Sequence, residues 1–197
     1  MSVPRSNNLI LASTSPYRRA LLERLGVPFR SVAPPFDEEA SKGERASPRE
    51  LAEALASGKA ESVQAGEPDA VVIGCDQLVA FEGRVFGKPG TAEGAVAQLL
   101  AMSGRTHELI TAMVILAPGR RFEHTDVARL TMRRLGRAAI ERYVERDRPF
   151  DCAGSYKLEQ GGVALFERIV SDDHTAITGL PLLALTGALA ELGFDAP

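Results

Sequence analysis

The chain has few of the residues that stabilise small secreted proteins or hold a protein in a membrane. Its 197 residues include 2 cysteines and no tryptophan, and 6% are aromatic. Two cysteines without a CxxC pair cannot build a disulfide framework, and they lack the partners of a zinc site. No apolar run approaches the ~20 residues of a membrane helix, and the first residues do not form a signal peptide. We therefore expect a cytoplasmic protein that does not associate with membranes.

A surplus of positive charge is also missing. The sequence has 23 Lys+Arg against 26 Asp+Glu, a formal net charge of -3, which argues against a general binder of RNA or DNA. Hydrophobic residues make up 45%, which excludes a disordered chain. The length fits a single domain over residues 1–197, arranged as two lobes. Net charge leaves open a local cluster of one sign.

Apolar runs alternate with helix signals along the chain. Strands are expected over residues 9–12, 29–32, 70–74, 78–81, 84–86, 109–116, 122–130 and 163–170. Helices are expected to begin at the caps Ser15, Ser47 and Thr91, and to span residues 137–145 and 181–192. The order lacks the regular βα repeat of a nucleotide-binding fold. We therefore expect an α/β protein with a mixed sheet and helices on both sides.

The segment STSPYRR joins the first predicted strand to the first predicted helix. A helix start offers unpaired N–H groups and a partial positive charge, which suit a phosphate. The hydroxyl of Ser13 and the planar guanidinium of Arg18 would strengthen such a site. The same residues also fit a capped helix with solvated arginines, so both interpretations stay open.

Asp76 comes just after the apolar run 70–74. A carboxylate in that position needs a partner, and the carboxyl ends of strands are where open α/β sheets bind ligands. Asp76 is therefore a candidate metal ligand or general base, unless it caps the strand end. One acid of the run Asp37, Glu38 and Glu39 could hold a divalent cation with it, although such runs are often solvated loops.

Two lysines complete the set of candidate residues. Lys59 falls on the apolar face of its predicted helix, either extending its ammonium to water or aiming it into a cleft. Lys88 lies in a Gly-Lys-Pro loop that could approach a ligand, or it is an ordinary turn lysine. Two carboxylates for a hard cation, with several cations for phosphates, suit metal-assisted attack of water on a phosphoanhydride.

Five motifs together resemble the Maf family of nucleotide pyrophosphatases, also known as septum-formation-inhibitor-like proteins. The resemblance covers about residues 9–189, and its motifs are LILASTSPYRR (9–19), GCDQ (74–77), GKP (87–89), SGRTH (103–107) and GLP (179–181). Five motifs in the right order are far more specific than any one of them alone.

The resemblance implies an elongated mixed α/β fold related to the inosine triphosphate pyrophosphatases, with two lobes around a central cleft. It implies a hydrolase that splits nucleoside triphosphates into monophosphate and pyrophosphate, with Mg²⁺ or Mn²⁺ as cofactor. Asp76 matches the family's proton acceptor, and Glu38 would lie with it near the metal. The residues that would hold phosphates are Ser13, Arg18, Lys59 and Lys88.

Three positions divide the family by substrate, and here they are Tyr17, Gln77 and Glu159. This set resembles the branch that acts on 7-methyl-GTP, because the dTTP and UTP branch usually has Arg, Thr and Gln. Methylation at N7 makes guanine cationic, and a cation over an aromatic face such as that of Tyr17 gains roughly 0.5–2 kcal/mol. Glu159 can accept the N1–H and N2–H of that base in a charge-assisted pair. A packed aromatic and a solvated loop acid are the plain alternatives.

We therefore expect hydrolysis of 7-methyl-GTP to 7-methyl-GMP and pyrophosphate, as house-cleaning of modified nucleotides. A dTTP/UTP pyrophosphatase of the same family is one alternative, and a non-catalytic, nucleotide-binding regulator of cell division is another. The expected partner is a small nucleotide and not a nucleic-acid polymer or a membrane. Family analogy allows a homodimer, which no sequence feature indicates.

Overall fold

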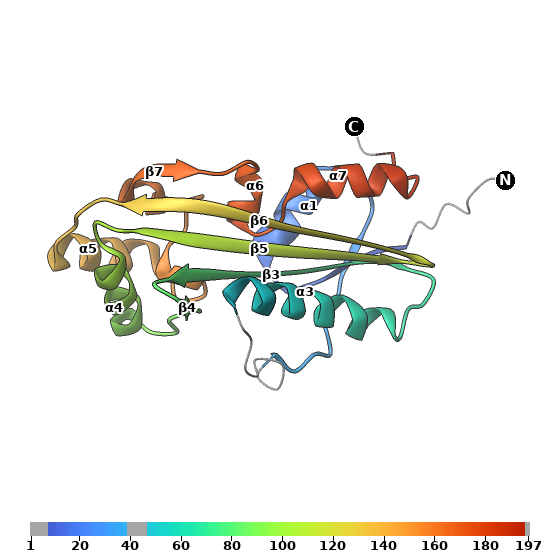
Figure 1. The fold of residues 1–197 in the computed structure, drawn as a ribbon, viewed down its shortest axis with the longest axis horizontal. Coiled ribbons are helices and arrows are strands. Elements are labelled where there is room, and N and C mark those ends of the chain that lie inside the picture. Colours follow the sequence, from blue (N-terminus) through green and yellow to red (C-terminus); the bar gives the residue numbers. More distant parts are fainter. Residues whose placement is uncertain (1–7, 39–46, 196–197) are drawn as a thin grey trace. The chain divides into compact units, whose positions relative to one another are not determined.

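The computed structural model describes residues 8–38 and 47–195, which form a mixed sheet with helices (Figure 1). The strands are β1 (Leu9–Ala12), β2 (Arg30–Ser31), β3 (Val71–Phe81), β4 (Arg84–Phe86), β5 (Thr106–Ala117), β6 (Arg120–Met132) and β7 (Phe166–Val170). The helices are α1 (Pro16–Glu23), α3 (Pro48–Gln64), α4 (Ala92–Met102), α5 (Arg137–Asp147), α6 (His174–Thr178) and α7 (Leu182–Glu191), with 3-10 turns η1 (Ala153–Ser155) and η2 (Gly161–Leu165). No helix in these ranges is long and apolar enough to cross a bilayer.

The sheet combines parallel and antiparallel neighbours. Its strand order is β2-β1-β3-β5-β6-β7, and β4 pairs with β3 outside this path. Strand β1 pairs in parallel with β2 and β3, whereas β3 with β4 and β6 with β7 are antiparallel. The predicted mixed α/β fold is thus confirmed.

The chain forms two compact units. The first unit comprises Met1–Asp76, Thr111–Asp126 and Asp173–Pro197, and the second comprises Gln77–Ile110 and Val127–Asp172. Strands β3, β5 and β6 each contribute residues to both units. The predicted cleft between two lobes, and the single domain over residues 1–197, stay predictions.

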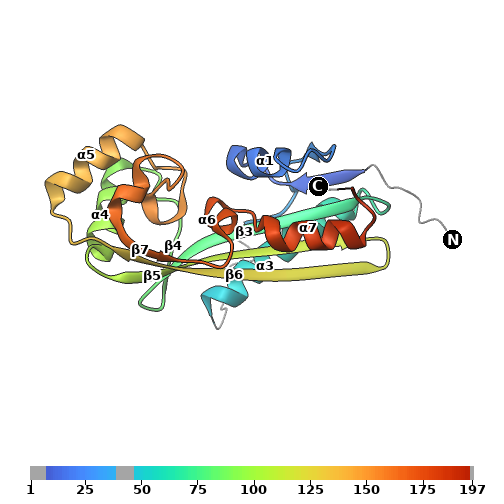
Figure 2. The same cartoon turned by 90° about the horizontal axis from the view of Figure 1, so that it is seen from above.

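In the first unit, helices cover both faces of the sheet. Helix α3 lies on one face, and α1 and α7 lie on the other (Figures 1 and 2). The α1/α7 face is filled by buried side chains such as Leu22, Ile73 and Leu185. On the α3 face, a Cβ at Gly74 would come within 2.3 Å of the Ala56 carbonyl oxygen. Only glycine allows the strand and helix to approach this closely.

In the second unit, α4 and α5 pack side by side (Figure 2). A buried aromatic cluster lies in the same unit, where the Tyr156 and Phe166 rings meet edge to face at 4.9 Å. His107 packs against both rings, and its Nε2 lies 3.0 Å from the Tyr156 hydroxyl. Burial lowers the pKa of His107 to about 4.

The predicted helix starts are confirmed. The side chains of Ser15, Ser47 and Thr91 each accept a hydrogen bond from a backbone N–H of the first helical turn. The predicted strand 29–32 is shorter, at Arg30–Ser31, and the predicted strand 163–170 begins as the 3-10 turn η2. Helix α6 was not predicted, because its five residues carry no apolar repeat.

Candidate active site

Three of the predicted site residues meet in the first unit, where Lys59 bridges two carboxylates. Its Nζ lies 2.6 Å from Asp76 Oδ1 and 2.8 Å from Glu38 Oε1. The side chains of Lys59 and Asp76 are only 8% and 10% exposed, whereas Glu38 is 48% exposed. The ammonium does not extend to water, and it faces carboxylates where the resemblance implied phosphates. This arrangement joins a buried ion pair to an acid that reaches solvent.

The sheet register explains the place of Asp76. Ala12, the last residue of β1, pairs with Gly74, so β3 continues past the end of β1. Asp76 therefore lies inside β3 and not directly after a strand, which corrects the prediction. Side chains alternate along a strand, so Asp76 faces α3 while Cys75 belongs to the core on the opposite face.

The loop before residue 39 places Glu38 beside Lys59. A Cβ at Gly58 would lie 2.2 Å from the Phe36 ring, so this ring rests directly on the backbone of α3. Gly58 precedes Lys59, and Phe36 comes two residues before Glu38. The packing of one aromatic ring thus brings an exposed acid to a buried lysine. Glu39, a predicted alternative ligand, lies outside the described residues.

Ser13 and Arg18 also come together, at the start of α1. The Ser13 hydroxyl oxygen accepts from the Ser15 N–H at 3.1 Å and from Arg18 Nη1 at 3.5 Å. Arg18 Nε donates to the carbonyl of Gly179 at 3.0 Å. Arg19 instead pairs with Glu23 on the exposed side of the helix. Arg18, and not Arg19, therefore belongs to the candidate phosphate site.

Gly179 is held in place by its surroundings. Its carbonyl also accepts from the Cys75 thiol at 3.1 Å, and its φ of 115° favours glycine. Asp173 caps α6 and accepts from the N–H and hydroxyl of Thr175 and the N–H of Leu183. Burial works to raise the pKa of Asp173, but these hydrogen bonds outweigh it and lower the pKa. Sequence reasoning missed Asp173, whose only signal was an acid followed by His-Thr.

The two cysteines have different environments. The Cys75 side chain is buried, and burial raises the pKa of its thiol. Cys152 is only half-buried. Both side chains are free thiols.

The remaining predicted residues are described within their own units. Tyr17 is half-buried in the first turn of α1, next to Arg18. Gln77 is half-buried in β3, Lys88 is exposed in the loop after β4, and Glu159 is exposed between η1 and η2. Gln77, Lys88 and Glu159 belong to the second unit, so their part in the Asp76 site stays a prediction.

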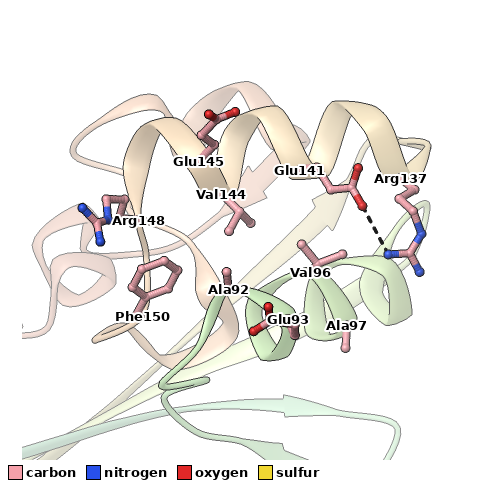
Figure 3. A pocket seen from close by; sticks show the side chains of 10 residues that line it. All are labelled: Ala92, Glu93, Val96, Ala97, Arg137, Glu141, Val144, Glu145, Arg148 and Phe150. Carbon is pink, nitrogen blue, oxygen red and sulfur yellow. Dashed lines mark hydrogen bonds and ion pairs between the residues drawn. The ribbon is translucent and has the colours of Figure 1, made fainter.

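A pocket of about 640 Å³ lies between α4 and α5 in the second unit (Figure 3). None of the predicted nucleotide-binding residues lines it. Its floor is apolar, and its charged side chains are Glu93, Glu141, Glu145, Arg137 and Arg148. Arg137 is already paired with Glu141. Acids outnumber bases here, so the pocket is unsuited to a triphosphate.

The resemblance implies a divalent cation beside Glu38 and Asp76. In residues 8–38 and 47–195, no three metal-binding acids, histidines or cysteines cluster together. Glu38 and Asp76 nevertheless meet at Lys59. Mg²⁺ at phosphate sites takes one or two carboxylates, with substrate oxygens and water completing the shell. Glu38 and Asp76 therefore fit a metal site in which the protein supplies two carboxylates. They do not fit a site in which the protein supplies every ligand.

The fold defines the general class of the chain. It is similar to the Ham1 protein of Staphylococcus aureus, with a TM-score of 0.54 at 15% identity over 92% of this chain and 98% of that one. A HAM1 protein from Coxiella burnetii gives a TM-score of 0.50 at 15% identity, covering 93% and 98%. At this identity the likeness shows a shared mixed α/β fold.

Within that class the chain belongs to the Maf family, because the Maf-like protein family model matches residues 8–192. It is 52% identical to a 7-methyl-GTP pyrophosphatase of Bdellovibrio bacteriovorus over 90% of this chain and 93% of that protein. It is 48% identical to a protein of the same name from Xanthomonas axonopodis pv. citri, covering 96% and 98%. The resemblance inferred from five motifs is confirmed.

Proposed function

We propose that this protein is a nucleoside triphosphate pyrophosphatase that hydrolyses 7-methyl-GTP to 7-methyl-GMP and pyrophosphate. The observation that carries the proposal is the buried ion pair of Lys59 and Asp76, with Glu38 as its second acid. It occurs in a chain up to 52% identical to proteins named for this reaction. A purely structural core has little use for a carboxylate pair that reaches solvent on one side.

Asp76 is the proposed general base. Lys59 binds Asp76 Oδ1, which leaves Oδ2 to accept a proton from the attacking water. The water oxygen bonds to the α-phosphorus, the bond from this phosphorus to the bridging oxygen breaks, and pyrophosphate leaves with the electron pair. Lys59 holds the carboxylate in one orientation during this step.

Ser13 and Arg18 are proposed to bind phosphate oxygens. The Ser13 oxygen already accepts two hydrogen bonds, so its own O–H is left to donate to an anion. Arg18 uses Nε and Nη1 on the protein and keeps further N–H groups for a phosphate. Lys88 is proposed as an additional phosphate contact because of its Gly-Lys-Pro motif.

Glu38 and Asp76 are proposed to hold Mg²⁺ or Mn²⁺. When bound, such an ion would offset charge on the phosphate oxygens. For the base, we propose that Tyr17 stacks on the cationic methylguanine, that Glu159 accepts its N–H groups, and that Gln77 completes the specificity set. A cytoplasmic location and a homodimer stay predictions, the latter open to light scattering of the purified protein.

A nucleotide panel tests the proposal. The purified protein is incubated with Mg²⁺ or Mn²⁺ and with 7-methyl-GTP, GTP, dTTP or UTP, and pyrophosphate is measured. We expect release from 7-methyl-GTP to dominate. Release from dTTP or UTP alone would favour the alternative branch of the family. Tight binding in a calorimetric titration without any hydrolysis would favour a regulatory binder.

Asp76→Asn tests the catalytic role within the same assay. We expect kcat to fall by at least about 100-fold, since the amide cannot accept the proton of water. Asp195→Asn is the matched control, because Asp195 is exposed near the end of the chain. Full activity of Asp76→Asn would exclude Asp76 as the base.

A further inference from the structure

Gln98 of α4 connects two loops of the second unit through its side-chain amide. Its Nε2 donates to the carbonyl of Gly87 at 3.2 Å, and its Oε1 accepts from the hydroxyl of Ser155 at 2.6 Å. The first loop carries Lys88, and the second leads to Glu159. One side chain thus joins the loop proposed to bind phosphate to the segment proposed to bind the base.

The chemistry of the two partners fixes the direction of this amide. A backbone carbonyl only accepts hydrogen bonds, so the amide nitrogen must face Gly87. The Ser155 hydroxyl then donates to the amide oxygen. A flipped amide would set its oxygen against the Gly87 oxygen. The Gln98 amide therefore donates one hydrogen bond and accepts another. A carboxylate cannot donate, and an apolar side chain can do neither.

The loop with Lys88 is held at both ends. Gln98 binds the Gly87 carbonyl, and the Gly90 N–H donates to the Phe150 carbonyl at 3.1 Å. Between these two points Pro89 restricts the backbone. The Lys88 side chain itself is exposed. The loop thus presents an exposed side chain from a backbone that is held on both sides.

Ser155 occupies an unusual turn. Gly154 and Ser155 both have positive φ angles, 72° and 64°, and Ser155 is fully buried. A Cβ at Gly154 would lie 2.6 Å from the Val79 side chain, so a glycine is required there. A serine in the left-handed region is strained, and its hydrogen bond to Gln98 offsets part of that strain.

The backbone on both sides of Glu159 is also fixed. The Lys157 N–H donates to the Tyr143 hydroxyl at 2.9 Å, and its carbonyl accepts from the N–H groups of Gln160 and Gly162. A single residue, Tyr156, separates Ser155 from Lys157, and its ring packs in the aromatic cluster. A shift at Ser155 is therefore passed along a tightly held segment to Glu159.

We propose that Gln98 is a positioning residue that holds the Lys88 loop and the Glu159 segment in one arrangement. The identity of the ligand rests on the proposed function, whereas the hydrogen-bond bridge does not. Without Gln98 both loops loosen, KM rises, and 7-methyl-GTP is less well distinguished from dTTP. Gln98 touches neither substrate nor reacting atoms in this role.

Amide hydrogen exchange of the ligand-free protein tests the bridge directly. Gln98→Leu removes both hydrogen bonds, Gln98→Glu removes only the donor to Gly87, and Ser155→Ala removes only the other bond. We expect exchange at Gly90, whose N–H is bonded to Phe150, to accelerate roughly tenfold in Gln98→Leu and clearly in Gln98→Glu. Acceleration at Gly90 in Ser155→Ala would show that the two loops are coupled. Unchanged exchange in both Gln98 variants would overturn the proposal.

Kinetics test the consequence for the reaction. For Gln98→Leu we expect KM for 7-methyl-GTP to rise roughly fivefold to tenfold while kcat stays within about twofold. Gln64→Leu is the matched control, since Gln64 is half-buried at the end of α3. A lower kcat with unchanged KM would contradict the positioning role. A wild-type protein that hydrolyses no nucleotide would overturn the proposed function alone, and the exchange data would still decide on the bridge.

Discussion

Lys59 combines a buried ammonium with two acids of unequal exposure. Its side chain is 8% exposed, and a charge so removed from water is stable only beside opposite charges. Asp76 and Glu38 supply them at 2.6 and 2.8 Å. The sequence placed Lys59 on an apolar helix face, but periodicity alone did not show whether the ammonium would meet phosphate, water or carboxylates.

Lys59→Met should therefore destabilise the protein and abolish turnover. Removal of one partner leaves Asp76 buried without its ion pair, which lowers the free energy of unfolding by about 3 kcal/mol. Urea unfolding and pyrophosphate release measure the two effects. In the double variant Lys59→Met/Asp76→Asn, part of the stability should return, because Asp76 no longer places a buried charge without its ion pair. Strictly additive losses would argue against the ion pair.

His107 should make stability depend on pH. Burial lowers its pKa to about 4 from the ordinary 6.5, so the unfolded chain takes up a proton before the folded one. This contribution is complete above pH 6.5 and is lost as the pH falls toward 4, by about 2–4 kcal/mol. Urea unfolding between pH 7.5 and 4.5 should show a shallower loss for His107→Gln than for the wild type. Parallel curves would contradict this prediction.

The helices and strands were predictable where local chemistry decides them. Serine and threonine caps determine where α1, α3 and α4 begin. Glu82 and Gly83, which both have positive φ angles, form the turn between the predicted strands 78–81 and 84–86. The short helix α6 depends instead on hydrogen bonds from Leu183, ten residues after Asp173, which no local pattern reveals. Equally, the partner that compensates the buried charge of Asp76 inside β3 is Lys59, 17 residues earlier.

Asp173→Ala should disrupt the link between α6 and α7. The carboxylate accepts from Thr175 and Leu183, so its loss removes a cap and the N–H partner at the start of α7. We expect the free energy of unfolding to fall by about 2–3 kcal/mol. Activity should fall as well, since Gly179 between these helices holds Arg18. Asp172→Ala, an exposed neighbour, is the control for both measurements.

At the scale of the whole molecule, the sequence predicted the family and the mixed sheet, whereas the joint site of the predicted phosphate-binding residues stays a prediction. It did not predict the roles of Asp173 and Gln98, whose partners are distant in sequence. The net charge of -3 argued against a polymer of nucleic acid, but it did not argue against a single nucleotide. A global sum cannot show where single cations such as Arg18 and Lys59 lie.

Chelation should separate activity from stability. In the parts of the chain that the structure describes, no closed cage of metal ligands exists, and Lys59 already places a positive charge between the acids. EDTA should therefore stop pyrophosphate release while shifting Tm by less than about 1 °C. Added Mg²⁺ should restore turnover without refolding. A drop in Tm of several degrees would mean that the ion is structural.

The position of Lys59 between Glu38 and Asp76 has a further consequence in a cell whose magnesium concentration varies. A protein that folds around a divalent ion is degraded when the ion becomes scarce. Here Lys59 supplies the positive charge between the acids, so a shortage of the proposed metal ion would stop turnover without unfolding the protein. Recovery would then need only an ion, and no new protein synthesis.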